Sequence, residues 1–592
     1  MINKNKSKKI FLLYTLLAIG FLIFLSVMLL TSLKSRNIPS IYAEDNSKAE
    51  RSSIISADGF HIATTKKVYK AIVNTRYIDP EKKELFVQLF SIYSGIDAKI
   101  IKEKLSKKEG VVVLSYDIAE KQAQYLKRLA HEFRRYKVFM EIVNERTGLK
   151  SVHGLSIIES GESREYPYGS LLTPVIGYPH KIEEDGYTKI SGVKGLEKRF
   201  DTELSARQDA SSKGSRDVNS YIILNKDSFT KAKINGLNIQ LNIPVSLQIR
   251  VEKICDEMKI ELDAQEIMVA VMETKTGKIK ALASSNRFLP KDIKRSDYGS
   301  LRSGMIEYSF EPGSVMKVIT FSLLLDKGLI NPYDLVNGHN GRFKIGRKVI
   351  TDEHKFDWLS AENVIVHSSN VGIAQLAQKL SGDEFHTGLL NFGFSKKSTS
   401  DLIYEKTGSI PSSRRLENEI YKATCAYGYG IRANLMQLIR AYSSFNNNGR
   451  IVKPRIVNNF TDEFNRKIKI EEEEPIQAIK SSTAQRVNKV LIKTVNEGTG
   501  TKAITEGLVV GGKTGTSHIV EKGKYVNKYN TSFLGFVNDK DKSYTMGVVV
   551  IQPHKSQFAA QTAVPVFKKV IDTMVEEGFL TPTPVSQPDV VQ

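Results

Sequence analysis

The sequence predicts an α+β protein whose C-terminal half packs a mass of helices on a mostly antiparallel sheet. The apolar run 267–272 returns through a turn to 279–283, a pattern typical of a β-hairpin. Residues 315–325 are apolar nearly all round, as expected of a buried helix. Two strand-like segments, 532–537 and 544–551, flank a polar turn near the end of the chain. Strand, helices and closing strands in this order predict helices packed on one sheet.

The N-terminal segment predicts a membrane anchor. Residues 10–33 contain no charged side chain. About 20 apolar residues cross a bilayer as a helix, whereas the apolar core of a cleaved signal peptide runs for only about 7–15. Four lysines precede the segment, so the positive-inside rule places residues 1–9 in the cytoplasm. We therefore expect a single-pass protein of the cytoplasmic (inner) membrane, with everything after residue 33 in the periplasm or extracytoplasmic space.

The composition narrows the classes of function. The 592 residues carry a formal net charge of +21, from 86 Lys and Arg against 65 Asp and Glu. A basic balance suits nucleic acid, but it equally suits an anionic membrane surface or an acidic polymer. The sequence has no zinc-finger spacing, RNA-binding signature or Arg–aromatic stripe, so we expect no nucleic-acid partner. The two cysteines, Cys255 and Cys425, are far apart, which excludes a disulfide framework and a structural zinc site.

Shifts in composition predict the domain boundaries. Residues 34–50 are polar and are expected to form a linker. Residues 51–235 alternate short β-branched runs with charged helical stretches, which predicts an α+β module without a cluster suited to chemistry. The segment 236–578 holds the predicted sheet and its helices. The tail 579–592 is polar and contains proline, so we expect it to be disordered.

A lysine inside the apolar helix is the first sign of chemistry. Lys317 follows Ser314 by three residues, so the two side chains share a helix face and the ammonium can reach the hydroxyl. Pro312 and Gly313 place Ser314 in the first turn. Burial disfavours a charged lysine, which leaves Lys317 available as the base that a serine nucleophile needs. The alternative is a lysine that snorkels from a core helix, with Ser314 as its cap.

Two further motifs follow Ser314 and Lys317 along the chain, and their order and context distinguish them from chance matches. Ser368-Ser369-Asn370 lies at a loop-to-helix junction, and Lys513-Thr514-Gly515-Thr516 lies in a strand before the last hairpin. Each pattern is weak alone, because chance copies occur in the same chain and are explained as turns or as accidents of spacing. The copies are Ser-x-x-Lys at 191–194 and 228–231, Ser-x-Asn at 284–286 and 444–446, and Lys-Thr-Gly at 275–277 and 406–408.

Taken together, the three motifs resemble the active-site motifs of penicillin-binding proteins. They read Phe310-Glu311-Pro312-Gly313-Ser314-x-x-Lys317, Ser368-x-Asn370 and Lys513-Thr514-Gly515-Thr516. The resemblance extends from about residue 51 to 575. Arg164-x-Tyr166-Pro167 is similar to the pedestal of class B members, and Tyr427-Gly428-Tyr429-Gly430 is similar to their division-specific (septal) subclass.

Three segments depart from the family pattern. Residues 51–59 keep little of the usual Arg-Gly…Asp-Arg-Asn-Gly. Ser395 stands where the family usually has glycine, and Asn434-Leu435-Met436 replaces the usual Thr-Pro before Gln437. These changes bear on the pedestal and on the subclass, and they leave the three motifs intact.

The resemblance implies a penicillin-binding/β-lactamase-like transpeptidase domain behind an α+β pedestal and a transmembrane helix. It implies a serine-type D-Ala-D-Ala transpeptidase that cross-links peptidoglycan stem peptides in septal wall synthesis and that β-lactams acylate. Its implied partners are the membrane, a membrane-embedded glycan polymerase and division proteins, and it requires no cofactor or metal. In the implied roles Ser314 is the nucleophile, Lys317 its base, Ser368 a proton relay and Asn370 a stem-peptide contact, while Lys513, Thr514, Gly515 and Thr516 form the substrate-binding strand.

Other readings remain open at this point. The elongation-specific transpeptidase of the same class shares the motifs. A β-lactamase or carboxypeptidase would use water as the acceptor, but these enzymes are generally smaller and lack the pedestal. A non-catalytic scaffold or β-lactam sensor belongs to a different class of function, and the intact motifs argue against it. Residues 34–240 are too few to add a glycosyltransferase, so we expect a monofunctional enzyme.

Overall fold

The structure is a computed structural model that describes residues 4–33, 42–107, 109–140, 142–143, 150–151, 154–184, 186–215, 217 and 222–584. The chain separates into two compact units. The smaller unit is formed by Met1–Ala49 and Gln208–Ile234, and the larger one by Glu50–Arg207 and Asn235–Gln592. Each unit combines segments that are distant in the sequence.

The smaller unit contains the predicted anchor. Helix α1 (Lys4–Leu33) includes a stretch, Lys6–Leu33, that is long and apolar enough to cross a membrane. Its side chains are exposed in the structure, as expected of a helix that meets lipid rather than protein. An N-terminal apolar helix suited to a single-pass anchor is therefore present where the sequence predicts one.

Part of the predicted linker 34–50 forms a strand instead. Strand β1 (Tyr42–Ser47) pairs antiparallel with β10 (Ala210–Ser215), and β10 pairs with β11 (Phe229–Lys231). Polar residues form this strand because a partner more than 160 residues away satisfies their backbone hydrogen bonds, which local composition does not reveal. Residues 34–41 of the predicted linker lie outside the described residues.

In the larger unit a mixed sheet runs through the N-terminal module. Its strand order is β21-β20-β12-β2-β3-β7-β9-β8, and β4 pairs with β3 on the side. Strands β20 and β21 come from residues after the predicted nucleophile, so the sheet combines segments on both sides of the boundary expected at 235/236. The strands are β2 (Ile54–Ile55), β3 (His61–Asn74), β4 (Val111–Ala119), β7 (Ser156–Glu165), β8 (Pro179–Glu184), β9 (Tyr187–Gly192), β12 (Asn238–Leu241), β20 (Val457–Thr461) and β21 (Lys467–Lys469).

A separate apolar core lies under the helices of this module. Helices α2 (Lys83–Ser94), α3 (Ala98–Lys107) and α4 (Glu120–Arg135) pack together with β3 and β4. The core includes Phe86 and Phe133, whose ring centroids lie 5.3 Å apart. Short elements elsewhere in the module are β5 (Ile142–Val143), β6 (Lys150–Ser151), α5 (Thr173–Ile176), α6 (Gly195–Arg199) and α7 (Asp201–Leu204).

The second sheet lies in the continuously described stretch 222–584 and is antiparallel throughout, in the order β14-β13-β25-β24-β23. It explains why the apolar run 267–272 does not alternate with polar residues. Met268 faces one core while Ile267 faces another, so both faces of the strand are buried. The strands are β13 (Glu266–Glu273), β14 (Ile279–Ser284), β23 (Val509–Glu521), β24 (Lys524–Asn538) and β25 (Ser543–Ile551).

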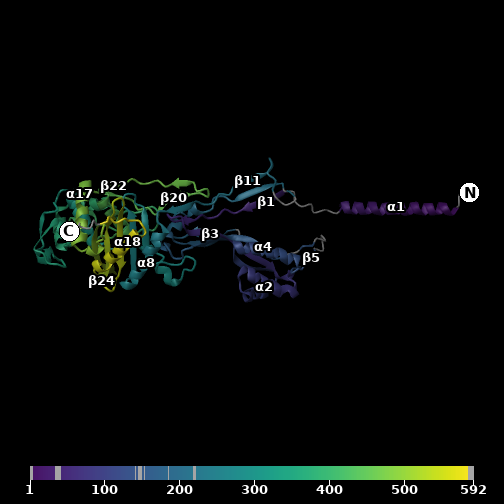
Figure 1. Cartoon of the computed structure of the whole chain (residues 1–592), viewed down its shortest axis with the longest axis horizontal. Helices are drawn as coiled ribbons and strands as arrows, with labels where there is room; N and C mark the ends of the chain where they lie inside the picture. Colours follow the sequence, from purple (N-terminus) through teal and green to yellow (C-terminus); the bar gives the residue numbers. More distant parts are fainter. Residues whose placement is uncertain are drawn as a thin grey trace, which may run out of the picture. The chain divides into compact units, whose positions relative to one another are not determined.

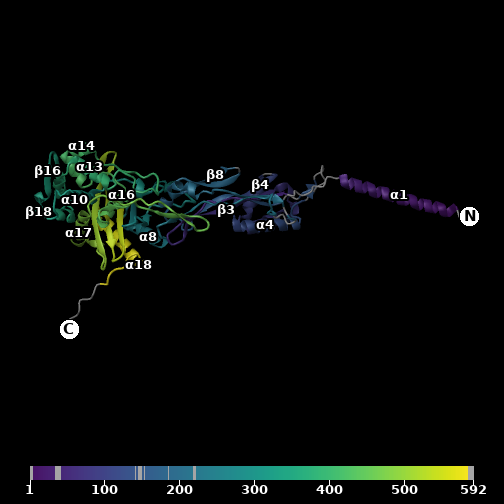
Figure 2. The same cartoon turned by 90° about the horizontal axis from the view of Figure 1, so that it is seen from above.

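Helices cover both faces of this sheet. Helices α8 (Val245–Glu261) and α18 (Ala563–Glu576) contact each other and the sheet on one side (Figures 1 and 2). Helix α16 (Leu435–Ser443) contacts β24 and β25 on the other. The larger helical mass also contains α9 (Gly304–Glu307), α10 (Met316–Asp326), α11 (Ala361–Val366), α12 (Asn370–Leu376), α13 (Gly382–Asn391), α14 (Ser413–Leu416), α15 (Glu419–Ala426) and α17 (Ser481–Glu497). Minor strands are β15 (Leu335–Asn337), β16 (Arg342–Ile345), β17 (Lys348–Thr351), β18 (Trp358–Ser360), β19 (Arg450–Ile451) and β22 (Ile476–Gln477).

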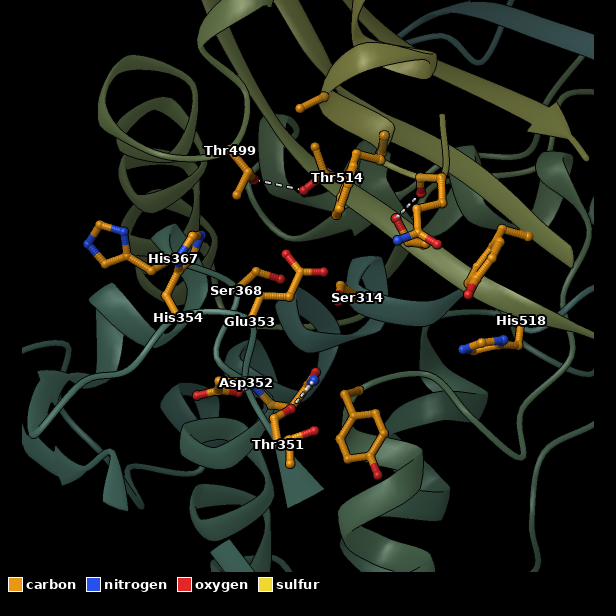
Figure 3. A pocket seen from close by; sticks show the side chains of 18 of the residues that line it. Ser314, Thr351, Asp352, Glu353, His354, His367, Ser368, Thr499, Thr514 and His518 are labelled. Atoms are coloured by element: carbon orange, nitrogen blue, oxygen red, sulfur yellow. Dashed lines mark hydrogen bonds between the residues drawn. The ribbon is translucent and has the colours of Figure 1, made fainter. Parts of the chain in front are cut away.

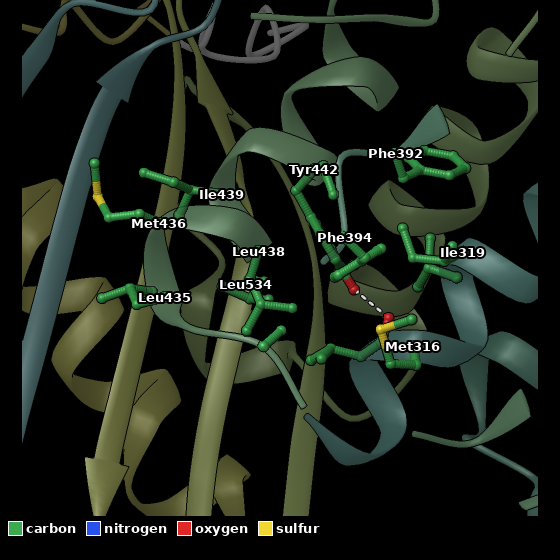
Figure 4. Packing of buried hydrophobic residues seen from close by; sticks show 14 of the residues in the cluster. Met316, Ile319, Phe392, Phe394, Leu435, Met436, Leu438, Ile439, Tyr442 and Leu534 are labelled. Carbon is green, nitrogen blue, oxygen red and sulfur yellow. Dashed lines mark hydrogen bonds between the residues drawn. The ribbon is translucent and has the colours of Figure 1, made fainter. Parts of the chain in front are cut away.

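Helix α10 is the buried central helix that the sequence predicts. Every residue from Met316 to Leu325 is buried. Met316 and Ile319 lie among Phe392, Phe394 and Tyr442 in a packed apolar cluster (Figure 4). The Tyr442 hydroxyl donates a hydrogen bond of 2.7 Å to the Val315 carbonyl, which ties α16 to the start of α10. The backbone ahead of α10 is therefore held from several sides.

The tail 579–592, expected to be disordered, is in part ordered. Leu580 is buried in the core under α18, and the Thr583 N–H donates to the Gly507 carbonyl at 2.9 Å. The Thr581 N–H donates to an Asp539 carboxylate oxygen at 2.9 Å. One apolar side chain and these hydrogen bonds hold residues 579–584 on the domain although their composition is polar. Residues 585–592 lie outside the described residues.

The serine at 395 has a backbone conformation that favours glycine. Its φ is 62°, in the left-handed region, and its side chain is exposed. A side chain costs about 1–2 kcal/mol in that conformation, and the greater backbone freedom of unfolded glycine offsets about 0.5–1 kcal/mol of any gain. We expect Ser395→Gly to raise the free energy of unfolding by about 0.5–1 kcal/mol. Chemical denaturation measures this, and Ser395→Ala, which keeps a Cβ, should give no such gain.

Candidate active site

A cavity of about 390 Å³ opens at the N-terminal end of α10 (Figure 3). The predicted site residues divide into two groups there. Ser314, Ser368, Asn370, Thr514 and Thr516 line the cavity. The remaining three, Lys317, Lys513 and Gly515, lie beneath its surface and are buried. The fold thus gathers side chains that are about 200 residues apart in the sequence.

The turn that carries Ser314 depends on a glycine. Ser314 lies in a short 3₁₀ turn, Gly313–Val315, directly before α10, and its side chain is half-buried. Gly313 has a φ of 64°, and a Cβ there would lie 2.4 Å from the Thr516 carbonyl oxygen. Only glycine therefore allows the turn to lie this close to β23. This contact places Ser314 beside the strand that carries Thr514 and Thr516.

Lys317 lies one helical turn further on and is fully buried. Burial lowers the pKa of its ammonium to about 7, although the negative charges of Asp352 and Glu353 act in the opposite direction. Its Nζ donates to the carbonyl oxygen of Ser368 and, at 3.1 Å, to the Ser368 hydroxyl. Among the described residues Lys317 forms its hydrogen bonds with Ser368 and not with Ser314. Because its pKa is lowered to about 7, Lys317 can lose its proton near neutral pH.

Lys513 is a second buried amine, on strand β23. Its Nζ donates to the carbonyl and hydroxyl oxygens of Thr514, each at 3.2 Å. Burial and the positive charge of Lys317 both lower the pKa of Lys513. Side chains alternate along a strand, so Thr514 and Thr516 face the cavity while Gly515 faces the Ser314 turn. A Cβ on Gly515 would lie 2.9 Å from the Pro312 carbonyl oxygen, so this position also keeps strand and turn together.

Ser368 and Asn370 flank the start of helix α12. Ser368 has a φ of 60°, a left-handed conformation that is uncommon for a non-glycine residue and that turns its side chain into the cavity. The next residue, Ser369, caps the helix by accepting from the Gly372 N–H at 2.8 Å. The Asn370 amide donates to the Thr351 carbonyl at 2.9 Å. The motif therefore combines one strained residue, one cap and one residue tied to the neighbouring strand β17.

Asp352 was not predicted from the sequence. Its carboxylate accepts hydrogen bonds from the Ser369 hydroxyl and from the N–H groups of Asn370 and Val371, the last at 3.0 Å. An anion at a helix N-terminus satisfies orphan backbone donors and stabilises the helix. It lies 17 residues before Ser369 in the sequence, so no local spacing pattern signals the contact. Asp352 fixes the loop after β17 against the motif.

An aromatic wall was also missed. Tyr427, Tyr429, His518 and Tyr529 line the cavity, the first two from the loop after α15 and the last two from β23 and β24. The rings of Tyr427 and Tyr429 lie 5.8 Å apart, and those of His518 and Tyr529 lie 4.5 Å apart. The sequence motif at 427–430 indicated only a subclass. Gly428 of this motif also allows the loop to lie against the Ser314 turn, because a Cβ there would lie 2.1 Å from the Gly313 carbonyl oxygen.

The chance copies of the motifs lie elsewhere. Ser191 donates to Asp201 in the pedestal, and Lys194 pairs with Glu307 at 2.9 Å. Lys275 lies in the turn between β13 and β14, and Lys406 in a loop whose N–H donates to the Ile306 carbonyl. None of these residues lines the cavity at Ser314. Order and context in the sequence therefore separate the clustered motifs from the scattered ones.

Comparison with known proteins agrees with this geometry. A model of the penicillin binding protein transpeptidase domain matches residues 267–572, more than half of the chain. The chain belongs to the penicillin-binding protein transpeptidase family. A model of the penicillin-binding protein dimerisation domain matches residues 46–241, ahead of the transpeptidase domain. The chain is thus a class B penicillin-binding protein, and the α+β fold class is confirmed.

Relatives match over much of their length. The stage V sporulation protein D of Bacillus subtilis is 27% identical over 584 residues, which cover 95% of this chain and 83% of that protein. The peptidoglycan D,D-transpeptidase FtsI of Buchnera aphidicola is 27% identical over 72% of each chain. A crystal structure of penicillin binding protein 2X from Streptococcus thermophilus shares the fold, with a TM-score of 0.71, 22% identity, and coverage of 90% of this chain and 82% of that one.

Proposed function

We propose that this penicillin-binding protein is a peptidoglycan D,D-transpeptidase in which Ser314 carries the acyl group. One observation carries the proposal. Lys317 is fully buried one helical turn after a serine that opens on the cavity, and its pKa is lowered to about 7. A serine is a weak nucleophile until a neighbouring base takes its proton, and a neutral lysine is such a base. If Lys317 only filled space in a core helix, there would be no reason for the serine three residues before it to line a cavity.

The first half of the reaction forms the acyl-enzyme. The Ser314 oxygen attacks the penultimate D-Ala carbonyl of a stem peptide while Lys317 takes the hydroxyl proton. The C–N bond to the terminal D-Ala then breaks, and the leaving nitrogen takes a proton. Ser368 is suited to relay that proton because its hydroxyl lies 3.1 Å from the Lys317 Nζ. A penicillin is attacked in the same way: the C–N bond of its β-lactam ring breaks, and the nitrogen takes a proton but stays attached through the carbon atoms of the ring.

Strand β23 and helix α12 supply the binding groups. Thr514 and Thr516 offer two hydroxyls to the terminal carboxylate, and the buried Lys513 amine supports them by donating to the Thr514 hydroxyl. Asn370 offers its amide oxygen to a stem-peptide N–H. The backbone N–H groups of Ser314 and Thr516 would hold the oxyanion. Gly515 allows the strand to lie against the Ser314 turn, so the two N–H groups belong to adjacent segments.

The rate of acylation by penicillin should increase with pH. A protonated Lys317 cannot accept the Ser314 proton, so the rate constant of penicillin acylation should rise as the pH increases through about 7 and then level off. Stopped-flow or quench measurement of acylation against pH checks this. A rate that stays constant from about pH 5 to 9 would argue against Lys317 as the base.

Turnover of a donor peptide tests the activity itself. The purified protein, given a stem peptide that ends in D-Ala-D-Ala and an amine acceptor, should release free D-Ala and form the amide in equal amounts. Chromatography with mass detection measures both products. Release of D-Ala without amide would indicate a carboxypeptidase. A protein that binds penicillin covalently but releases no D-Ala would instead be a scaffold or sensor.

We propose a septal role on the basis of the 427–430 motif and of the FtsI relative. The proposed arrangement places residues 1–9 in the cytoplasm, the anchor at 10–33, the pedestal at 51–235 and the transpeptidase domain at 236–578 outside the membrane. A membrane-embedded glycan polymerase and division proteins are the proposed partners. A reporter fused after residue 592 should be active only in its extracytoplasmic form. Depletion should give filaments that grow without dividing, whereas round cells would indicate the elongation enzyme.

A further inference from the structure

An acidic side chain projects into the cavity opposite the anion-binding strand. Glu353 follows strand β17 and Asp352, and its carboxylate points towards Ser368 and Ser314 (Figure 3). The side chain is exposed. Within the described part of the chain it takes part in no hydrogen bond or ion pair. An unpaired carboxylate at this place is a binding group for a cation that enters the cavity.

The position of Glu353 is fixed through its neighbour. The Asp352 carboxylate is bonded to the Ser369 hydroxyl and to two N–H groups of α12, and the Asp352 N–H donates to the Gly341 carbonyl at 3.0 Å. The backbone at 352 is therefore held on both sides. Glu353 extends from this anchored segment into the cavity, beside the lysine-bound Ser368.

The charges of the cavity are divided between its walls. Strand β23 provides Lys513 with the Thr514 and Thr516 hydroxyls, which suit the carboxylate of a donor peptide. Glu353 lies on the other wall, and its charge acts on Lys317 and Lys513 without an ion pair to either. A second carboxylate would be repelled there and an ammonium attracted. The primary amine of an acceptor stem is an ammonium at neutral pH, because amines of this type have a pKa of about 10.

We propose that Glu353 binds the ammonium of the acceptor peptide next to the Ser314 acyl-enzyme. This inference rests on the proposed transpeptidase function and names the residue that selects its second substrate. The bound ammonium passes one proton through the exposed carboxylate to water. The amine lone pair then forms the new C–N bond, the C–O bond to Ser314 breaks, and the second amine proton moves through Lys317 to the Ser314 oxygen.

The test separates transfer to an amine from formation of the acyl-enzyme. The full-length protein, its Glu353→Gln and Glu353→Lys variants and the control Asp357→Asn are compared, since Asp357 is an exposed acid of the same loop that does not line the cavity. Each is given an acyl-D-alanyl thioester donor with D-alanine, an acceptor whose nitrogen is an ammonium at pH 7, or with hydroxylamine, whose nitrogen is mostly uncharged at that pH. Penicillin acylation and thioester hydrolysis are measured in parallel.

We expect Glu353→Gln to raise the KM for D-alanine by about fivefold, the upper end for an exposed ion pair, with kcat nearly unchanged. Glu353→Lys should lower transfer to D-alanine by more than about tenfold, because like charges then meet. Because the charge of Glu353 also acts on Lys317, both variants can shift hydroxylamine transfer, hydrolysis and penicillin acylation, but the change for D-alanine should exceed each of these changes. Asp357→Asn should stay within about twofold of the parent in every assay, since surface substitutions seldom change more. An unchanged KM for D-alanine in both variants overturns the inference. A parent protein that penicillin does not acylate would instead overturn the proposed function, independently of Glu353.

Discussion

Replacement of Ser314 by alanine should abolish covalent labelling of the protein by a fluorescent penicillin. The acyl group needs an oxygen to which it can attach. Among the residues that the structure describes, Ser314 alone has its hydroxyl in a turn against β23 with a buried lysine one helical turn away. The substitution removes one half-buried hydroxyl, so the fold should persist. Fluorescence on a denaturing gel measures labelling, and the thermal unfolding midpoint checks that the variant is folded.

Serines of the chance motifs serve as matched controls. Ser191→Ala and Ser228→Ala should label at the parent rate. Ser191 donates to Asp201 in the pedestal, and Ser228 caps a turn by donating to the Asn225 carbonyl. Loss of labelling in either folded variant would contradict the assignment of Ser314 as the only acylated serine.

Replacement of Lys317 should have the second large effect, on the rate of acylation. Loss of a general base typically slows a reaction by about 10²–10⁴-fold, so we expect acylation by penicillin to slow by that factor. Lys317→Met is the better variant, because an unbranched side chain of similar length fills the buried site and avoids a cavity. Time courses of labelling give the rate constant, and the rise of rate with pH through about 7 should disappear with the amine.

Substitutions of other lysines test whether the loss of acylation rate is specific to Lys317. Lys275→Met and Lys406→Met should acylate at the parent rate, since neither residue lines the cavity. Lys513→Met should slow acylation, because Lys513 is buried beside Thr514 on the proposed carboxylate-binding strand. Rapid acylation of folded Lys317→Met would show that another group accepts the Ser314 proton.

The elements that could be predicted from the sequence are those with a strong period of their own. The apolar segment 544–551 is predicted as a strand, and β25 occupies Ser543–Ile551. The apolar run 315–325 corresponds to α10, which is buried because other helices surround it. The run 267–272 is likewise a strand with both faces covered. In each segment the side chains themselves determine the structure.

Features that depend on distant partners could not be predicted. Strand β1 lies in a polar segment that pairs with β10, and β20 joins the sheet of the pedestal through β12. The order in the tail depends on Leu580, one apolar residue in a polar sequence. Asp352 and Glu353 reach the cavity because the loop after β17 folds against α12, a contact across 17 residues that has no sequence period. The motif residues could be found because each motif is short and because the three motifs in this order resemble those of a known family.

The site of acylation is the most direct measurement. Full-length protein is treated with benzylpenicillin, digested and analysed by mass spectrometry. If Ser314 is the nucleophile, one penicilloyl group should lie on the peptide that contains Ser314, and fragmentation should place it on that serine. The Ser314→Ala protein should carry none. A penicilloyl group on a peptide that lacks Ser314, formed at the parent rate in folded protein, would contradict the central assignment.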